Sequence, residues 1–177
     1  VKPRSPKRTL MKKLDRLVID EVSMVRADVL DAVDRCLRIA RGRPEPFGGV
    51  QIVLVGDFLQ LPPVVPMAER EILSHFGYEG PFAFDARVLR EVGVARLPFT
   101  RVWRQSDEYF VGHLAALRSG RFVADAVAAI NEASYRPHRE GRIPVVLAPT
   151  NARVDAYNRR GLEGLAEDGR IYDGASQ

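Results

Sequence analysis

The sequence predicts an α/β protein built around a parallel sheet. Two short and almost entirely apolar runs, Leu17–Ile19 and Val50–Val55, have the composition of strands that helices cover on both faces. Between them, apolar residues recur at helical spacing and predict a helix over Ala27–Arg41. A strand, a helix and a second strand in this order are the unit from which parallel sheets are built.

The other elements are predicted in order along the 177 residues. Residues 1–13 are basic and contain proline, which indicates an arm or loop. Pro44 follows the first helix and cannot continue it. Residues 59–88 are rich in proline, glycine and aromatic side chains, so only short helical patches are expected there. Strands are expected at 94–99 and 143–148, and helices at 107–118, 122–133 and 152–165.

A domain boundary is predicted where this alternation of strands and helices starts again, near residue 105. The first domain would comprise residues 1–104 and the second residues 105–177. An apolar fraction of 46% is ample for a packed core in each part.

Composition narrows the setting in which the chain works. The longest apolar runs are too short to cross a bilayer, and the basic start lacks the apolar stretch of a secretion signal, so no membrane partner is expected. A single cysteine, Cys36, excludes an internal disulfide, and three scattered histidines offer no zinc cluster. A reducing, cytoplasmic location follows as the expectation. The net charge of +4 is compatible with nucleic acid but is a weak indication of it.

The first candidate site is the acidic pair Asp20-Glu21, directly after the first strand. Ligands of open α/β sheets bind at the carboxyl ends of the strands. An ATPase needs one carboxylate near its magnesium ion and another that orients the attacking water, and Asp20 and Glu21 suit these roles. The competing interpretation is an acidic loop that only favours the amino-terminal end of the next helix.

The second candidate is Gln60, which lies just beyond the end of the second strand in Gly56-Asp57-Phe58-Leu59-Gln60. A neutral amide at this place can hydrogen-bond a γ-phosphate or the attacking water. Pro62-Pro63 stiffens the backbone that follows, so that a movement of Gln60 would be transmitted. The competing interpretation is an exposed glutamine in a surface loop.

Taken in order, these segments resemble helicase motifs II and III of the PIF-one-like and RecD-like superfamily-one-B DNA helicases. Asp20–Met24 matches the first motif and Gly56–Pro63 the second, and the resemblance runs from Leu17 to Leu165. Further segments that fit the same family are Gly48–Gln51, Pro81–Asp85, Arg101–Asp107, Phe110–Gly120 and Ala148–Asn158.

The resemblance implies a RecA-like P-loop NTPase sheet in a partial first motor domain, followed by the start of a second RecA-like domain. ATP and Mg²⁺ would bind between the two. Glu21, Gln60 and Arg104 would be catalytic, with Arg104 reaching the γ-phosphate from the second domain as an arginine finger. Asp20 and Glu21 would face the metal, and the nucleotide would also contact Asp20, Asp57, Gln60 and Arg104.

The nucleic-acid partner implied is single-stranded DNA, with DNA junctions as a further substrate. Pro62, Pro63, Thr150 and Asn151 would contact the strand. Thr150 or Asn151 also suits the amino-terminal cap of the helix that follows, and the two roles are compatible. Trp103 is expected to pack in the core, beside Val102, in preference to stacking on a base.

The function implied is an ATP-dependent DNA helicase that moves 5′ to 3′, in a bacterial-type, nucleoid-associated setting. The alternative is a non-catalytic nucleic-acid-binding or scaffold domain derived from a degenerate motor.

One departure from the family matters: no segment matches G-x-x-x-x-G-K-[ST], the loop that holds the phosphates. The chain alone is therefore expected to bind ATP weakly or not at all and to lack helicase activity. The phosphate-loop strand of the resembled fold pairs with the strand that ends at Asp57. Without it, residues 51–55 would keep an unpaired apolar edge, which predicts self-association or pairing with flanking segments of the same protein.

Overall fold

A computed structural model describes residues 6–134 and 145–165 of the chain. The chain forms two compact units, Val1–Ala133 and Ser134–Gln177. Within the described residues, no helix is long and apolar enough to span a membrane. The boundary predicted at 104/105, between two motor domains, does not coincide with the division between these two units. It stays a prediction.

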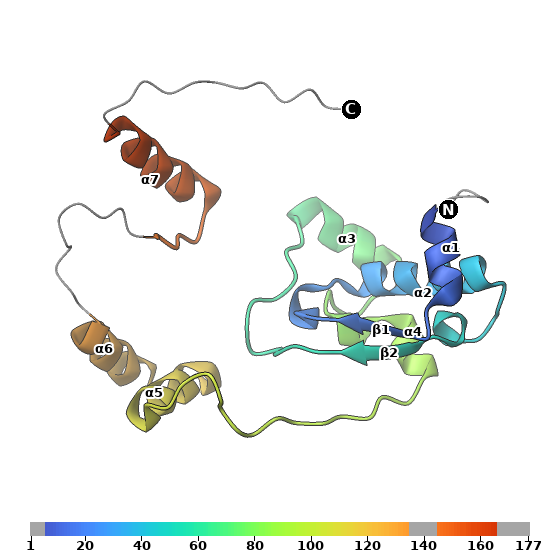
Figure 1. Ribbon diagram of the computed structural model, residues 1–177, viewed down its shortest axis with the longest axis horizontal. Coiled ribbons are helices and arrows are strands. Elements are labelled where there is room, and N and C mark those ends of the chain that lie inside the picture. Colours follow the sequence, from blue (N-terminus) through green and yellow to red (C-terminus); the bar gives the residue numbers. More distant parts are fainter. Residues whose placement is uncertain (1–5, 135–144, 166–177) are drawn as a thin grey trace. The chain divides into compact units, whose positions relative to one another are not determined.

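The first unit is built on a parallel pair of strands, β1 (Arg16–Ile19) and β2 (Gln51–Leu54), as predicted (Figure 1). Arg16 lies opposite Gln51 and Ile19 opposite Leu54, so the two strands end level with each other. In the described part of the chain the sheet has only these two strands. Their carboxyl ends therefore lie at one edge, where the candidate site residues follow.

Helix α2 (Ala27–Arg41) connects the strands and has the bounds that the periodicity predicts. Gly42 ends it in a left-handed conformation with φ 65°, which a residue without a side chain adopts at little cost. Buried residues of α2 share one core with the turn that precedes β2, and partly buried residues of both strands pack against this core. The buried core consists of Val22, Ala27, Leu30, Leu37, Phe47, Val50, Ala83, Ala86 and Val88.

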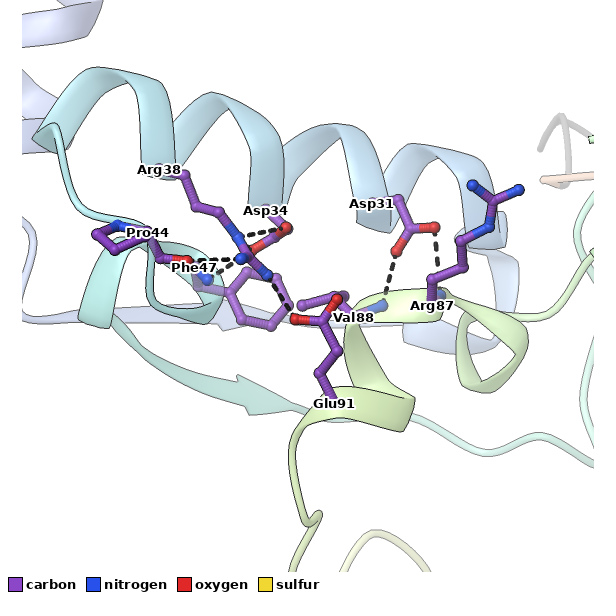
Figure 2. Close-up of polar contacts among 8 residues, drawn as sticks. All are labelled: Asp31, Asp34, Arg38, Pro44, Phe47, Arg87, Val88 and Glu91. Atoms are coloured by element: carbon purple, nitrogen blue, oxygen red, sulfur yellow. Dashed lines mark hydrogen bonds and ion pairs between the residues drawn. The ribbon is translucent and has the colours of Figure 1, made fainter.

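Two aspartates of α2 tie this helix to neighbouring segments (Figure 2). Asp34 accepts the Phe47 N–H from the 3₁₀ turn η2 (Pro46–Gly49) and pairs with Arg38 Nε at 2.9 Å. Asp31 accepts the N–H groups of Arg87 and Val88 at 3.2 and 3.0 Å, at the start of α4 (Arg87–Glu91). The Phe47 N–H is buried and the Val88 N–H is partly buried. Such donors are costly without an acceptor, so these two carboxylates hold α2 to the segments beside it.

Other parts of the first unit extend this frame. The expected helical patches in 59–88 are α3 (Met67–His75) and the 3₁₀ turn η3 (Ala83–Asp85). The helices predicted after residue 106 are α5 (Glu108–Ser119) and α6 (Val123–Ser134). Asp107 caps α5 by accepting the Phe110 N–H at 3.0 Å, and Gly120 ends it at φ 69°.

Two predicted elements of the first unit are wrong. Residues 6–13 form helix α1 (Pro6–Lys13), and residues 1–5 lie outside the described part. Arg41 of α2 donates to the carbonyls of Lys12 and Leu14 at 2.9 and 2.8 Å, so a tertiary contact holds this basic segment. Residues 94–99 form no strand, because no described strand pairs with them and Leu97 and Phe99 are exposed.

The second unit contains the predicted last helix, α7 (Asn151–Glu163). Thr150 occupies its N-cap position, but its side chain makes no capping hydrogen bond. The strand expected at 143–148 is absent from its described part, since residues 145–148 have no regular structure and no partner strand in the described chain. Residues 143 and 144 lie outside the described residues.

Candidate functional site

The site residues predicted on the two strands are brought together at the carboxyl edge of the sheet. Val55 donates its N–H to Ile19 O at 2.9 Å, and Val22 donates its N–H to Val55 O at 3.0 Å. These bonds extend the strand pairing past the sheet and join the segment after β1 to the segment after β2. Asp20-Glu21 and Gly56–Gln60 are therefore parts of one locked edge.

Gly56 makes this close approach possible. A Cβ at position 56 would lie 2.9 Å from the Val22 backbone nitrogen and 3.0 Å from Val22 Cγ1. The first distance is too short for a Cβ unless the Val22 backbone shifts, and the second is a tight contact that the Val22 side chain would have to relieve. A glycine directly after β2 is thus required for the spacing of the two acidic segments.

Glu21 has an unusual backbone conformation. Its φ of 50° and ψ of 42° are left-handed, which costs a residue with a side chain on the order of 1 kcal/mol. The Glu21 N–H donates to Asp20 Oδ1 at 2.8 Å, and Glu21 O accepts the Met24 N–H at 3.1 Å. This turn starts the 3₁₀ helix η1 (Val22–Met24) and leaves both carboxylates exposed beyond the strand.

Asp57 organises the turn that carries Gln60. Its Oδ1 accepts the Leu59 N–H at 3.1 Å, and its carbonyl accepts the Gln60 N–H at 3.0 Å. Arg118 of α5 approaches the same carboxylate, with Nε 2.9 Å from Oδ2 and Nη2 3.2 Å from Oδ1. Hydrogen bonds from Arg118 and then from Leu59 lower the pKa of Asp57 below its ordinary value of 3.8, against the opposing effect of partial burial. The Gln60 side chain is exposed.

The acidic pair fits the metal that the resemblance implies. No cluster of three or more histidine, cysteine, aspartate or glutamate side chains that would hold a metal occurs among the described residues. Mg²⁺ in nucleotide sites needs no such cluster, because it keeps waters and takes one or two carboxylates together with phosphate oxygens. Asp20 and Glu21 supply that number of hard oxygen ligands at an exposed edge.

The remaining predicted residues are Arg104, the proline pair, Thr150 and Asn151. Arg104 is exposed in a segment without regular structure, and the described residues offer it no ion pair. Of the proline pair, Pro62 is exposed and Pro63 is buried, so Pro62 is the accessible member. Thr150 and Asn151 belong to the second unit and are exposed there.

The structure adds residues that the sequence did not single out. Phe58 lies edge-on to Phe84 with ring centroids 5.0 Å apart, and Phe82 stacks on Phe84 at the same separation. This aromatic contact packs the turn after β2 against the segment around η3. In the sequence, Arg118 belongs to Phe110–Gly120, a segment that fits the family, but nothing there assigned it a role. A pocket of about 440 Å³ lined by Arg26, Glu69 and Tyr78 includes none of the predicted site residues.

Comparison with known proteins decides the family. The family described as PIF1-like helicase matches residues 1–121, more than half of the chain. The chain belongs to the PIF1-like helicase family. It is 37% identical over 160 residues to the ATP-dependent DNA helicase PIF1 of Rattus norvegicus, covering 89% of this chain and 24% of that protein. It is 32% identical over 153 residues to the ATP-dependent DNA helicase RRM3 of Saccharomyces cerevisiae, covering 86% of this chain and 20% of that protein.

Solved structures of this family have the same fold. The Pif1 helicase from Bacteroides in complex with ADP-AlF₃ and single-stranded DNA matches with a TM-score of 0.85 at 35% identity, over 95% of this chain and 39% of that one. Bacteroides Pif1 bound to single-stranded DNA matches with a TM-score of 0.86 at 37% identity, over 98% of this chain and 40% of that one. The predicted RecA-like α/β fold class and the predicted family are confirmed. The chain spans about a quarter of the length of the PIF1 relative from Rattus norvegicus.

Proposed function

We propose that this chain forms the nucleotide-hydrolysing and phosphate-sensing part of an ATP-dependent DNA helicase that moves 5′ to 3′ on single-stranded DNA. The observation that carries the proposal is the locked sheet edge, where the Val22–Val55 hydrogen bond of 3.0 Å holds the acidic pair beside the Gln60 turn. Family membership supports it, since curated relatives are named ATP-dependent DNA helicases and a Bacteroides Pif1 was solved with ADP-AlF₃ and single-stranded DNA.

The acidic pair would divide the work of hydrolysis. ATP with its magnesium ion supplies the phosphoanhydride bond that is broken and the neutralisation of phosphate charge. Asp20 would hold the magnesium ion, and Glu21 lies next to it at the same exposed edge. The Glu21 carboxylate would orient the attacking water and accept its proton. The left-handed backbone at Glu21 favours this role, because strained conformations of this kind concentrate at functional sites.

The other predicted residues would read and stabilise the phosphates. The Gln60 amide would donate to the γ-phosphate or to the water, and Asp57 would hold the turn on which Gln60 is carried. Arg104 would stabilise the charge that develops as the phosphate is transferred. Arg104 is the last residue before the predicted boundary, so it would reach the nucleotide from the segment that joins the two motor domains.

The partners follow from the same proposal. Pro62, Pro63, Thr150 and Asn151 would contact single-stranded DNA, and DNA junctions would be a further substrate. The unused N-cap hydroxyl of Thr150 supports a phosphate contact at the start of α7. A cytoplasmic, nucleoid-associated location is part of the same proposal. The edge of β2 that no described strand pairs with would take either a second copy or a flanking segment of the same protein.

The 177-residue chain by itself is proposed to be inactive, because none of its segments matches the phosphate-binding loop. Magnesium-dependent ATP turnover by the purified chain would overturn this part of the proposal.

The catalytic assignment is tested by Arg104→Ala in a protein that carries this chain together with a phosphate-binding loop. DNA-stimulated ATP turnover is expected to fall on the order of 10³-fold, as for a true arginine finger. The matched control is Arg101→Ala, three residues earlier, whose guanidinium lies 3.8 Å from the Trp103 ring centroid. Equal turnover by both variants would refute the role of Arg104. An unaltered protein that binds DNA but hydrolyses no ATP would favour the scaffold alternative.

A further inference from the structure

The ion pair between Asp57 and Arg118 joins the Gln60 turn to a helix far along the chain. Arg118 lies in the last turn of α5, 61 residues after Asp57. Two guanidinium nitrogens face the two carboxylate oxygens, at 2.9 and 3.2 Å. This fork geometry fixes the orientation of both groups more firmly than a single contact does.

Asp57 is more than an exposed surface carboxylate. Its side chain is 25% exposed, whereas that of Arg118 is 60% exposed. The same carboxylate also accepts the Leu59 N–H at 3.1 Å, inside the turn closed by the Gln60 N–H and Asp57 O. A displacement of Arg118 that moves the Asp57 carboxylate therefore also moves the backbone that carries Gln60. The hydrogen bond from Arg118, followed by that from Leu59, lowers the pKa of Asp57, as expected for a carboxylate held by these donors.

Helix α5 also connects the Asp57–Arg118 contact to the segment that carries Arg104. Helix α5 begins at Glu108, four residues after Arg104, and Asp107 caps it through the Phe110 N–H. The segment that carries Arg104 is thus attached to the same helix that grips Asp57. An exposed ion pair is weak enough to form and break as two parts of a protein move.

We propose that Arg118 is a positioning residue, which ties the Gly56–Gln60 turn to α5 and so couples the phosphate-sensing amide of Gln60 to the segment that carries Arg104. The proposal rests on the proposed function, because it assigns a mechanical link within that site. Arg118 contacts neither nucleotide nor DNA in this role. It acts through Asp57.

The test uses Arg118→Ala in a protein that carries this chain together with a phosphate-binding loop. The control is Arg90→Ala, which removes another exposed arginine–carboxylate pair, Arg90–Glu79 at 3.1 Å. The first readout is amide hydrogen exchange at Leu59 and Gln60, which requires no activity. Faster exchange in Arg118→Ala and unchanged exchange in Arg90→Ala are expected.

The second readout is steady-state ATP turnover with single-stranded DNA present. Arg118→Ala is expected to lower kcat on the order of 10-fold, because a misplaced catalytic group loses rate more than binding. The KM for ATP should change less than kcat. The kcat of Arg118→Lys should lie between those of the unaltered protein and Arg118→Ala, since an ammonium group cannot form both hydrogen bonds to the Asp57 carboxylate.

The outcomes separate this proposal from the function on which it rests. Unchanged exchange at Leu59 and Gln60 in Arg118→Ala would overturn the proposal whatever the turnover. Normal turnover by Arg118→Ala in an otherwise active helicase would overturn it and leave the proposed function intact. An unaltered protein without DNA-stimulated turnover would remove the proposed function, and the coupling with it.

Discussion

Asp34→Ala tests whether the frame beneath the site is held by one buried carboxylate. Asp34 lies on α2 with a side chain only 12% exposed, and it accepts the Phe47 N–H and pairs with Arg38 at 2.9 Å. Phe47 is only 3% exposed, so water cannot replace Asp34 as the acceptor of its N–H. Its φ of 53° is left-handed. The substitution leaves this buried donor without an acceptor.

The magnitude follows from that single donor. A buried N–H without a partner costs about 1–3 kcal/mol. With an m-value of roughly 2 kcal/mol per M, a loss of about 2 kcal/mol lowers the urea midpoint of the first unit by about 1 M. The assay is equilibrium urea unfolding followed by far-ultraviolet circular dichroism.

Two further variants isolate the cause. Asp34→Asn keeps an oxygen that accepts the Phe47 N–H and should recover most of the lost stability. Glu91→Ala removes the other carboxylate partner of Arg38, at 2.9 Å, but leaves Asp34 and Phe47 joined, so it should move the midpoint far less. If Asp34→Ala unfolds at the same urea concentration as Glu91→Ala, the carboxylate does not hold the turn before β2.

Three other predictions concern the site edge. Gly56→Ala should destabilise the first unit by about 1–3 kcal/mol in thermal unfolding, because the added Cβ is overpacked against Val22. Gly93→Ala is the control, since nothing lies within 4 Å of its added Cβ. Equal melting temperatures of the two variants would refute the argument. The pKa of Asp57, measured by carboxyl NMR, should lie below 3.8. Its contribution to stability is therefore present above pH 3.8 and is lost as the pH falls through the lowered pKa. Arg118→Ala should move the pKa of Asp57 back towards 3.8. The purified chain should self-associate through the edge of β2 that no described strand pairs with, and a monomer by light scattering at all concentrations would contradict this.

The strands and long helices could be predicted because their signals are local. The apolar runs before Asp20 and Gly56 and the periodicity of Ala27–Arg41 each specify an element without help from distant residues. Gly42 and Gly120 mark helix ends in the sequence, and both have left-handed backbones in the structure. The family was accessible for the same reason, since its motifs are short segments in order.

What the sequence could not provide depends on tertiary contact. Residues 6–13 look like a basic arm, and only the bonds from Arg41 to the carbonyls of Lys12 and Leu14 show why a helix is held there. Residues 94–99 are apolar enough for a strand but find no partner in the described chain. Trp103, expected in the core, is 79% exposed with Arg101 stacked on its ring.

The candidate site divides in the same way. Asp20, Glu21 and Gln60 follow from strand ends, because parallel strands that end level present their next residues at one edge. The fork between Asp57 and Arg118 joins residues 61 positions apart, and no spacing rule in a single sequence connects them. The roles of Arg104, Thr150 and Asn151 stay predictions.

Glu21→Gln tests the central claim most directly, in a protein that carries this chain together with a phosphate-binding loop. The amide keeps the shape of the carboxylate but cannot accept a proton from water. ATP binding, followed with a fluorescent analogue, should be nearly unchanged, while DNA-stimulated hydrolysis should be abolished. The matched control, Glu71→Gln on the exposed part of α3, should hydrolyse ATP at the unaltered rate. Hydrolysis by Glu21→Gln at that same rate would contradict the assignment of this sheet edge as the catalytic centre.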